Sequence, residues 1–180
     1  MEQKRYDIIN LLLRDKDHVR GIARQLNTNP MAITRIMKTL RAENVVDYRE
    51  EGKNKTYFLK DTLEAKSYVF STESFKLTRM LAKYPRLRGI IENLQKDKRV
   101  QLVVLFGSYA KGIAKEDSDI DIFIETNDLA LKKELALIDT KLSIKIGMLD
   151  NSNLLSKEIV KNHVIIKGVE LYYEKNPIFN

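Results

Sequence analysis

Apolar residues recur every three or four positions in three successive segments near the start of the chain. The three stripes are Tyr6, Ile9, Leu12 and Leu13; Val19, Ile22, Ala23 and Leu26; and Ile33, Ile36, Met37 and Leu40. This spacing places each stripe on one face of an amphipathic helix, so we expect three short helices. Asp17 is a suitable N-cap for the second helix. Thr28 or Asn29 can cap the third, with Pro30 in its first turn.

The next segment has the pattern of a β-hairpin. Residues 45–49 and 55–59 are rich in β-branched and aromatic residues and flank the turn sequence Glu-Glu-Gly-Lys-Asn. Two short helices followed by a hairpin with a basic tip resemble a winged helix-turn-helix, which implies double-stranded DNA as a partner. We expect base-edge contacts from Thr34, Arg35 and Lys38, and phosphate contacts from Arg49, Lys53 and Lys55. A winged helix used only for protein contacts is the alternative.

Residues 61–99 predict a helical linker, because the segment contains no glycine before Gly89. Asp61 and Glu64 have the spacing of a capping box, and Pro85 ends one helix or begins the next. The linker has a surplus apolar face, and winged helices generally bind paired half-sites on DNA. We therefore expect a homodimer.

Apolar strands alternate with helical segments in residues 100–180. Val100 and residues 102–106 predict a buried strand, and Ile120, Ile122 and Ile124 predict a second with one buried face. Residues 142–149 predict a third strand and residues 168–174 a short final one, with helices between them. The whole chain is therefore expected to be α+β, with a small mixed sheet in its C-terminal part.

The residues that could bind a metal or a phosphate lie at the ends of the first two of these strands. Asp119 and Asp121 are two positions apart on a strand, so both carboxylates point to the same side. Two like charges this close repel unless a cation such as Mg²⁺ lies between them. Gly107 allows the backbone to approach a phosphate, and Ser108 can donate its hydroxyl where a helix begins. This arrangement predicts a phosphate-binding turn beside a metal site.

Gly107-Ser108, ten further residues and then Asp119-x-Asp121 resemble the signature of the minimal nucleotidyltransferases of the DNA polymerase β superfamily. The resemblance covers residues 100 to about 175. It implies that Asp119 and Asp121 are catalytic metal ligands for Mg²⁺, and that the Gly-Ser turn holds a nucleoside triphosphate, with ATP the first choice. It also implies transfer of a nucleoside monophosphate to a hydroxyl acceptor.

One part of the family pattern is missing from this sequence. Active relatives usually carry a third carboxylate on the next strand, where this chain offers Ser143, Lys145 and Gly147. Asp139 and Asp150 flank that strand and could substitute if the register slips. Lys145 could instead contact a phosphate. The sequence therefore leaves open whether the chain is an enzyme.

Charge is distributed unevenly along the 180 residues, whose net charge is +7. Residues 1–60 carry 13 Lys and Arg against 8 Asp and Glu, whereas residues 100–180 carry 10 against 12. A basic front half favours a polyanionic partner, although a solvated lysine-rich surface would have the same composition. The chain lacks cysteine, a run of eighteen apolar residues and a signal-peptide pattern at its start, so we expect a cytoplasmic protein without a membrane segment.

These patterns predict a winged helix-turn-helix in residues 1–60, a helical linker or dimerisation segment in residues 61–99, and a nucleotidyltransferase-like domain in residues 100–180. Three functions are compatible with them. The chain could be a DNA-binding nucleotidyltransferase, or a transcriptional regulator that senses nucleotide without turnover. By resemblance, it could also be an antitoxin-like partner of a helical toxin.

Overall fold

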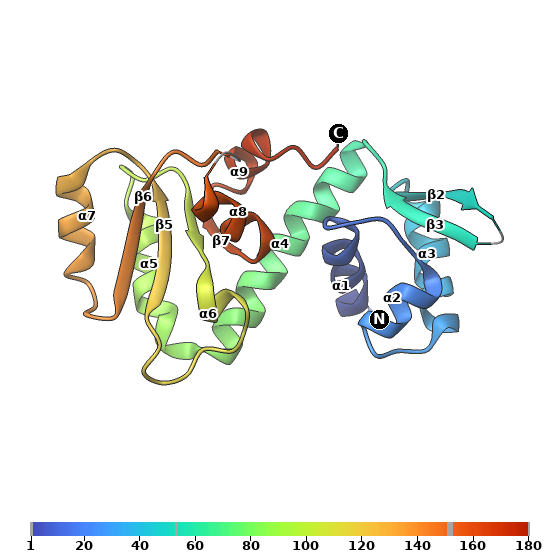
Figure 1. Cartoon of the computed structure of the whole chain (residues 1–180), viewed down its shortest axis with the longest axis horizontal. Helices are drawn as coiled ribbons and strands as arrows, with labels where there is room; N and C mark the ends of the chain where they lie inside the picture. The colour runs from blue at the N-terminus through green and yellow to red at the C-terminus, as the bar shows by residue number, and fades with distance from the viewer. Residues whose placement is uncertain (1, 53, 151–152, 180) are drawn as a thin grey trace. The chain divides into compact units, whose positions relative to one another are not determined.

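The chain forms two compact units in the computed structural model, which describes residues 2–52, 54–150 and 153–179 (Figure 1). The first unit comprises residues 1–72 with 178–180, and the second comprises residues 73–177. Both are mixed helix and strand structures, which confirms the expected α+β class. Within the described ranges, no helix combines the length and the apolar character needed to cross a membrane.

The N-terminal unit has the element order of a winged helix. Its elements are α1 Glu2–Leu12, β1 Asp17–His18, α2 Val19–Gln25, α3 Pro30–Ala42, β2 Val46–Glu51 and β3 Asn54–Leu59. The strands pair antiparallel in the order β1-β3-β2, so β2 and β3 form the predicted hairpin. The apolar stripe of the third helix is buried as expected, on Ile33, Ile36, Met37 and Leu40.

The caps of α2 and α3 follow different rules. Asn29 caps α3, because its side chain accepts a hydrogen bond from the Met31 amide at 2.8 Å, and Pro30 occupies the first turn. The expectation that Asp17 caps α2 is wrong, since Asp17 lies in β1 and the N-cap residue is His18. The Asp17 carboxylate instead accepts a hydrogen bond from the Gln25 side chain at 2.8 Å.

The linker is helical, with α4 Leu63–Lys83, a 3₁₀ turn η1 Pro85–Leu87 and α5 Arg88–Lys96. Pro85 begins the 3₁₀ turn, as its fixed backbone angle and missing amide favour. The predicted capping box at Asp61 is wrong. Thr62 takes that role, because its hydroxyl accepts a hydrogen bond from the Ala65 amide at 3.2 Å. Residues of α4 contribute to both compact units.

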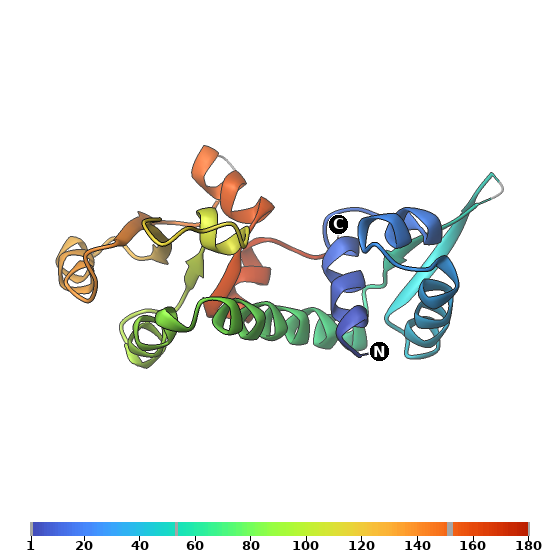
Figure 2. The same cartoon turned by 90° about the horizontal axis from the view of Figure 1, so that it is seen from below.

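A four-stranded mixed sheet forms the centre of the C-terminal unit. Its elements are β4 Val103–Leu105, α6 Gly107–Ala110, β5 Ile120–Glu125, α7 Leu129–Ala136, β6 Leu142–Gly147, α8 Leu154–Lys161, β7 Val164–Lys167 and α9 Val169–Lys175. The strand order is β6-β5-β4-β7, with β5 and β6 parallel and the other pairs antiparallel. Helix α5 covers one face and α8 the other (Figure 2).

The end of the chain differs from the expected order. Residues 168–174, predicted as a final strand, belong mostly to helix α9, and the strand lies earlier, at Val164–Lys167. The apolar residues 164–166 form β7, which pairs antiparallel with β4, where Ile165 is opposite Val104. Gly168 then turns the backbone with a φ of +81°. A Cβ at this position would lie 2.3 Å from the Gln101 carbonyl oxygen.

The alternation in β5 divides its side chains between two apolar cores. Ile120, Ile122 and Ile124 are buried in the core on the α5 side. Phe123 belongs to the core formed with α8 and α9. Residues two apart on a strand share a face, so Asp121 lies on the same side as Phe123. The sheet is therefore packed on both faces, and the half-buried Asp121 carboxylate lies near the start of β5.

Glu73 is a buried carboxylate that joins α4 to the C-terminal helices. Its side chain is fully buried and accepts hydrogen bonds from Lys76 Nζ at 3.0 Å and from the Tyr173 hydroxyl at 2.6 Å. The His163 ring lies 3.6 Å from it. Burial alone would raise the pKa of Glu73, but hydrogen bonding to His163 and the charge of Lys76 outweigh burial and lower the pKa to about 2.

Glu73→Gln is therefore expected to lower the free energy of unfolding by about 1–3 kcal/mol at pH 7, because Lys76 loses its charged partner. The folded-state pKa lies below the ordinary value of 4.5. Ionised Glu73 therefore stabilises the fold above pH 4.5 and loses that contribution as the pH falls toward 2. Urea unfolding of both proteins across this range should show the difference shrinking toward acid. Glu174→Gln, at an exposed position of α9, is the control, and a constant difference would contradict the assignment.

Candidate functional site

The Gly-Ser turn and the aspartate strand approach each other closely. β4 ends at Leu105, and the Phe106 amide donates to the Asp121 carbonyl oxygen at 3.0 Å. Gly107 follows with a φ of +67°, and a Cβ built on it would lie 2.3 Å from Asp121 Oδ2. Only glycine fits this position, because any side chain would collide with the carboxylate. The two halves of the motif are thus in van der Waals contact.

The two aspartates have different surroundings. Asp119 is exposed, whereas Asp121 is half-buried. Burial raises the pKa of Asp121 and the charge of Asp119 adds to the rise, while a hydrogen bond from Ser143 and the charge of Lys145 oppose it. The neighbouring charges therefore only partly compensate the Asp121 carboxylate, and a cation bound between the aspartates would complete the compensation.

The register between β5 and β6 decides what stands beside this carboxylate. Asp121 is paired with Ser143, and Phe123 with Lys145. Asp139, before β6, accepts a hydrogen bond from the Lys141 amide at 2.8 Å. Asp150, after β6, accepts one from the Asn153 side chain at 3.3 Å. Within the described part of the chain, no three His, Asp or Glu side chains gather in a way that could hold a metal ion.

The residues fit a metal ion that shares its coordination with a bound triphosphate. Asp119 and Asp121 offer hard oxygen donors, which Mg²⁺ prefers, and Mg²⁺ usually takes one or two protein carboxylates together with phosphates and water. The missing Cβ of Gly107 lets the Asp121 carboxylate lie directly against the backbone of the Gly-Ser turn, so a phosphate on that turn would be next to the carboxylate. Two carboxylates beside a close backbone approach are a suitable donor set for a magnesium–nucleotide complex.

The sequence pattern did not indicate Glu158, which lies near the site. This residue of α8 is close enough to Asp121 for its charge to contribute to the raised pKa of that group. Its carboxylate lies 3.3 Å from the Lys111 ammonium, which follows α6. No spacing rule connects residues 47 positions apart, so only the packing of α8 against the sheet brings them together.

The basic positions predicted for DNA contact lie on α3 and the wing. Thr34, Arg35 and Lys38 are exposed on α3, opposite its buried stripe. The Thr34 hydroxyl donates to the Pro30 carbonyl at 3.0 Å, so it is partly engaged within its own helix. Among the side chains that the structure describes, Arg35 and Lys38 form no ion pair, which leaves both cations available to an external anion.

The wing carries a cluster of cations and aromatic rings centred on Tyr48, which sequence reasoning missed. The Lys55 ammonium lies 4.2 Å from the centre of the Tyr48 ring and donates to its hydroxyl at 3.1 Å. The Arg41 guanidinium lies 4.7 Å from the same ring. Arg49 is exposed and lies 5.2 Å from the Phe58 ring. Lys53, the sixth predicted DNA contact, lies outside the described residues.

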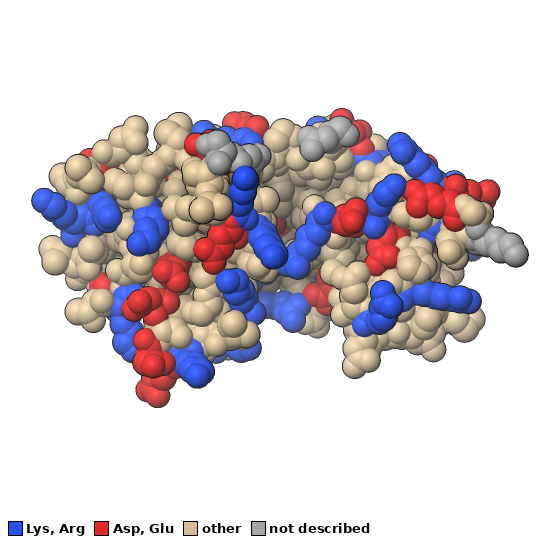
Figure 3. Space-filling view, viewed as in Figure 1, with Lys and Arg blue, Asp and Glu red and all other residues tan. Residues whose placement is uncertain are grey.

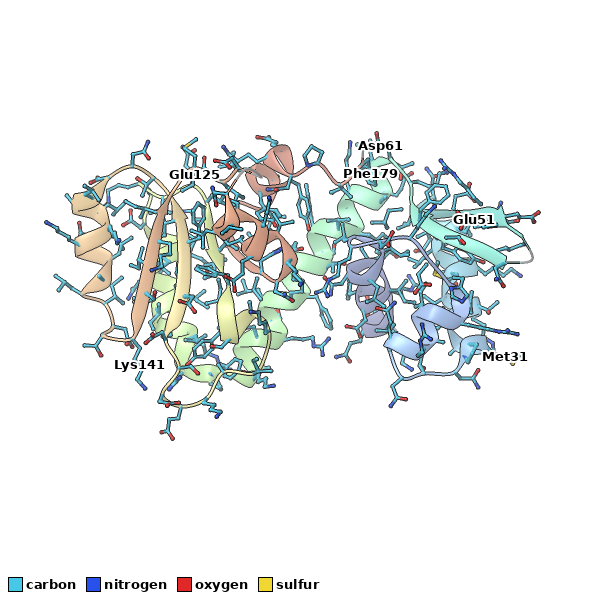
Figure 4. All side chains as sticks on the ribbon, in the orientation of Figure 1. Met31, Glu51, Asp61, Glu125, Lys141 and Phe179 are labelled. Atoms are coloured by element: carbon cyan, nitrogen blue, oxygen red, sulfur yellow. The ribbon has the colours of Figure 1, made fainter. Side chains whose placement is uncertain are left out.

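Acidic side chains also gather over the wing (Figure 3). Glu51, labelled in Figure 4, lies 2.9 Å from the Lys16 ammonium, so part of this negative charge is neutralised within the unit. Glu50 beside it is exposed. The cations of the wing therefore stand among carboxylates, whereas the outer face of α3 offers Arg35 and Lys38 without such neighbours in its own sequence.

Residues 88–177, half of the chain, match the family model described as "Polymerase beta, Nucleotidyltransferase". Two similar curated proteins, both from Methanocaldococcus jannaschii, carry the name "Putative protein adenylyltransferase". The first is 38% identical over 66 residues, which are 37% of this chain and 64% of that protein. The second is 36% identical over 72 residues, which are 38% of this chain and 84% of that protein. The chain thus spans just under two thirds of the length of the first.

Among solved structures, the chain resembles the adhesin competence repressor AdcR from Streptococcus pyogenes. The two are 21% identical, and the match covers 47% of this chain and 63% of the repressor, with a TM-score of 0.40.

Gly107→Ala is expected to destabilise the C-terminal unit by about 1–3 kcal/mol, because the new Cβ would be strained at positive φ and would displace the Asp121 carboxylate. Gly89→Ala is the matched control. A Cβ on Gly89 meets nothing within 4 Å, and this position in helix α5 should gain about 0.5–1 kcal/mol. Thermal unfolding of the two variants measures the contrast. Equal stability of both would contradict the close contact at Gly107.

Proposed function

The chain belongs to the polymerase β nucleotidyltransferase family, and on that basis we propose that its C-terminal unit binds a nucleoside triphosphate together with Mg²⁺. The observation that carries the proposal is the contact of Gly107 with Asp121, which places the Gly-Ser turn directly beside a partly compensated carboxylate. ATP is the proposed nucleotide, because the similar curated proteins are named as adenylyltransferases.

Each site residue has a proposed role in holding the nucleotide. Gly107 and Ser108 hold the triphosphate through the backbone and a hydroxyl. Asp119 and Asp121 hold Mg²⁺, which when bound would polarise the α-phosphate and stabilise the leaving pyrophosphate. Lys145, whose charge reaches Asp121 from β6, would contact a phosphate oxygen.

The proposed reaction is transfer of AMP to a hydroxyl group, and the relatives' names suggest a protein as its acceptor. The acceptor hydroxyl would lose its proton to water and its oxygen would bond to the α-phosphorus, while the bond to the bridging oxygen of the β-phosphate breaks and pyrophosphate leaves. In this chain Ser143, rather than a carboxylate, stands beside Asp121 on β6. A serine hydroxyl does not accept a proton at neutral pH, so transfer is expected to be slow.

This same observation favours a second function, in which the unit binds nucleotide and acts as a sensor without turnover. Both functions need the same binding residues and differ only in whether AMP is transferred. Ser143 on β6 is compatible with the sensor function, because nucleotide binding needs only the two aspartates and the Gly-Ser turn.

The N-terminal unit is proposed to bind double-stranded DNA through α3 and the wing. Arg35 and Lys38, exposed and without ion pairs within the described ranges, would enter the major groove together with Thr34. Arg49 and Lys55, with Lys53, would hold phosphates. Residues 1–60 and 100–180 would be the binding domains, with 61–99 as a linker that forms a homodimer on paired half-sites. A winged helix that contacts only proteins would show none of this salt-dependent binding.

Ser143→Asp is expected to raise AMP transfer by about tenfold or more, because it places a third carboxylate beside Asp121. The measurement is incorporation of label from α-labelled ATP into protein or a hydroxyl acceptor, with Mg²⁺. The control is Ser143→Asn, because asparagine has nearly the same size as aspartate but no charge, and this variant should not gain activity. Asp119→Asn should lose both transfer and nucleotide binding. Label transfer by Ser143→Asp no higher than that of Ser143→Asn would contradict the proposed role of this position.

The Arg35→Ala/Lys38→Ala double variant is expected to bind mixed-sequence duplex DNA about tenfold more weakly in 0.1 M salt, and to reduce the salt slope of binding by about two. Fluorescence anisotropy over a series of salt concentrations gives both quantities. The control is Lys66→Ala. This variant removes a cation of α4 that is already paired with Asp61, so it should bind DNA like the wild type. An absence of salt-sensitive binding by the wild type would refute DNA binding.

A further inference from the structure

The two halves of the Gly-Ser and Asp-x-Asp signature are joined by residues 111–119, hereafter the motif loop. The loop leaves α6 and leads directly into β5, and Gly112 within it has a φ of +71°. Next to α6, the Ile113 amide donates to the Ser108 carbonyl at 3.0 Å, and the Lys111 ammonium lies 3.3 Å from the Glu158 carboxylate of α8. At the loop tip the bonds are local: the Lys115 amide donates to the Ser118 hydroxyl at 2.8 Å, and the Ser118 amide donates to the Lys115 carbonyl at 3.2 Å. These short-range bonds shape the loop tip but do not attach the loop to the rest of the unit.

Three basic side chains from outside the motif loop donate to its backbone carbonyls. Lys83 Nζ, at the end of α4, donates to the Gly112 carbonyl at 2.5 Å. Arg86 uses two nitrogens: Nη1 donates to the Glu116 carbonyl at 3.0 Å, and Nη2 to the Lys115 carbonyl at 3.4 Å. The third cation, labelled at the start of β6 in Figure 4, is Lys141, whose Nζ donates to the Glu116 carbonyl at 2.7 Å.

Arg86 also contacts the helix that carries the Gly-Ser turn. Its guanidinium lies 5.4 Å from the centre of the Tyr109 ring, and Tyr109 directly follows Ser108 in α6. The Tyr109 ring is buried and packs edge-on against Tyr84, with 4.8 Å between the ring centres. One arginine therefore touches both sides of the motif: the short helix after the Gly-Ser turn, and the loop before the aspartates.

We propose that Arg86 and Lys83 are positioning residues of the nucleotide site. By holding the motif loop to the end of α4 and to η1, they keep Asp119, the residue at which the loop ends, in register with the Gly-Ser turn. Both residues precede residue 88, where the family match begins, so the working site extends beyond the segment that carries the signature. The role in nucleotide binding rests on the proposed function, whereas the restraint of the loop does not.

The physical reason is that the sheet and the loop are stabilised by different contacts. β4 and β5 are buried on both faces and do not need the cations, whereas the loop tip, residues 115 and 116, is attached to the unit through hydrogen bonds from the cations to its carbonyls. A hydrogen bond from a charged donor is stronger than one between neutral groups, and the arginine fork fixes direction as well as distance. Loss of Arg86 should therefore loosen the loop and leave the sheet intact.

The test compares the full-length wild type with Arg86→Ala, Arg86→Lys and Arg88→Ala. Arg88 is the matched control, an exposed arginine of α5 that makes no side-chain hydrogen bond or ion pair within the described residues. In Arg86→Ala, amide hydrogen exchange in residues 112–119 should become about tenfold faster while exchange in residues 122–124 stays unchanged. The dissociation constant for Mg-ATP, from isothermal titration calorimetry, should rise about tenfold. Arg88→Ala should match the wild type in both measurements.

Arg86→Lys keeps the charge but can make only one of the two carbonyl bonds, so it should show an intermediate increase in loop exchange. This variant decides the matter if Arg86→Ala fails to fold. The proposal would be overturned if amide exchange in the loop of either folded variant were as slow as in the wild type. It would also be overturned if exchange became faster by the same factor in the loop and in β5. If the wild type binds no Mg-ATP, the proposed function fails, and loop exchange alone decides whether Arg86 restrains the loop.

Discussion

The candidate site depends on one close approach, that of the Gly107 backbone to the Asp121 carboxylate. A Cβ on Gly107 would lie 2.3 Å from Oδ2, so the absence of a side chain there is what allows the Gly-Ser turn to lie against the carboxylate. The backbone bond from Phe106 to the Asp121 carbonyl fixes the two strands at that point. The register of β6 against β5 brings Ser143 rather than a carboxylate beside Asp121. The proposed nucleotide binding and the proposed slow turnover would thus both follow from one local geometry.

Local patterns predicted those parts of the structure that local interactions decide. The helical stripe of α3, its Asn29 cap and the alternation of β5 all depend on residues close together in sequence, and each is present. The winged-helix order of the first unit also followed from such patterns. For the same reason the Gly-Ser turn and the aspartate strand could be expected to lie together, since only a short helix and a loop of nine residues, 111–119, separate them.

Contacts between distant residues could not be predicted in this way. Glu73 meets Tyr173 across 100 positions, and Arg86 meets the motif loop across about thirty, so no periodicity connects them. The final strand was misplaced because residues 164–174 are apolar enough for either element. The positive φ of Gly168 and its contact with Gln101, which decide the boundary, arise only in the packed unit. Asp17 is predicted as a cap from its residue type and Asp61 from its spacing to Glu64, but the caps are the neighbouring residues His18 and Thr62.

The most direct test of the account is whether the chain binds ATP through Asp121 and a divalent ion. Isothermal titration of full-length protein with ATP, with Mg²⁺ and then with EDTA, would be compared with the same titrations of Asp121→Asn, which removes the charge and keeps the shape. The proposed site predicts one nucleotide per chain with Mg²⁺, weaker binding with EDTA, and at least about a tenfold loss of affinity in Asp121→Asn. Equal binding by both proteins, or no binding by the wild type with Mg²⁺, would contradict it.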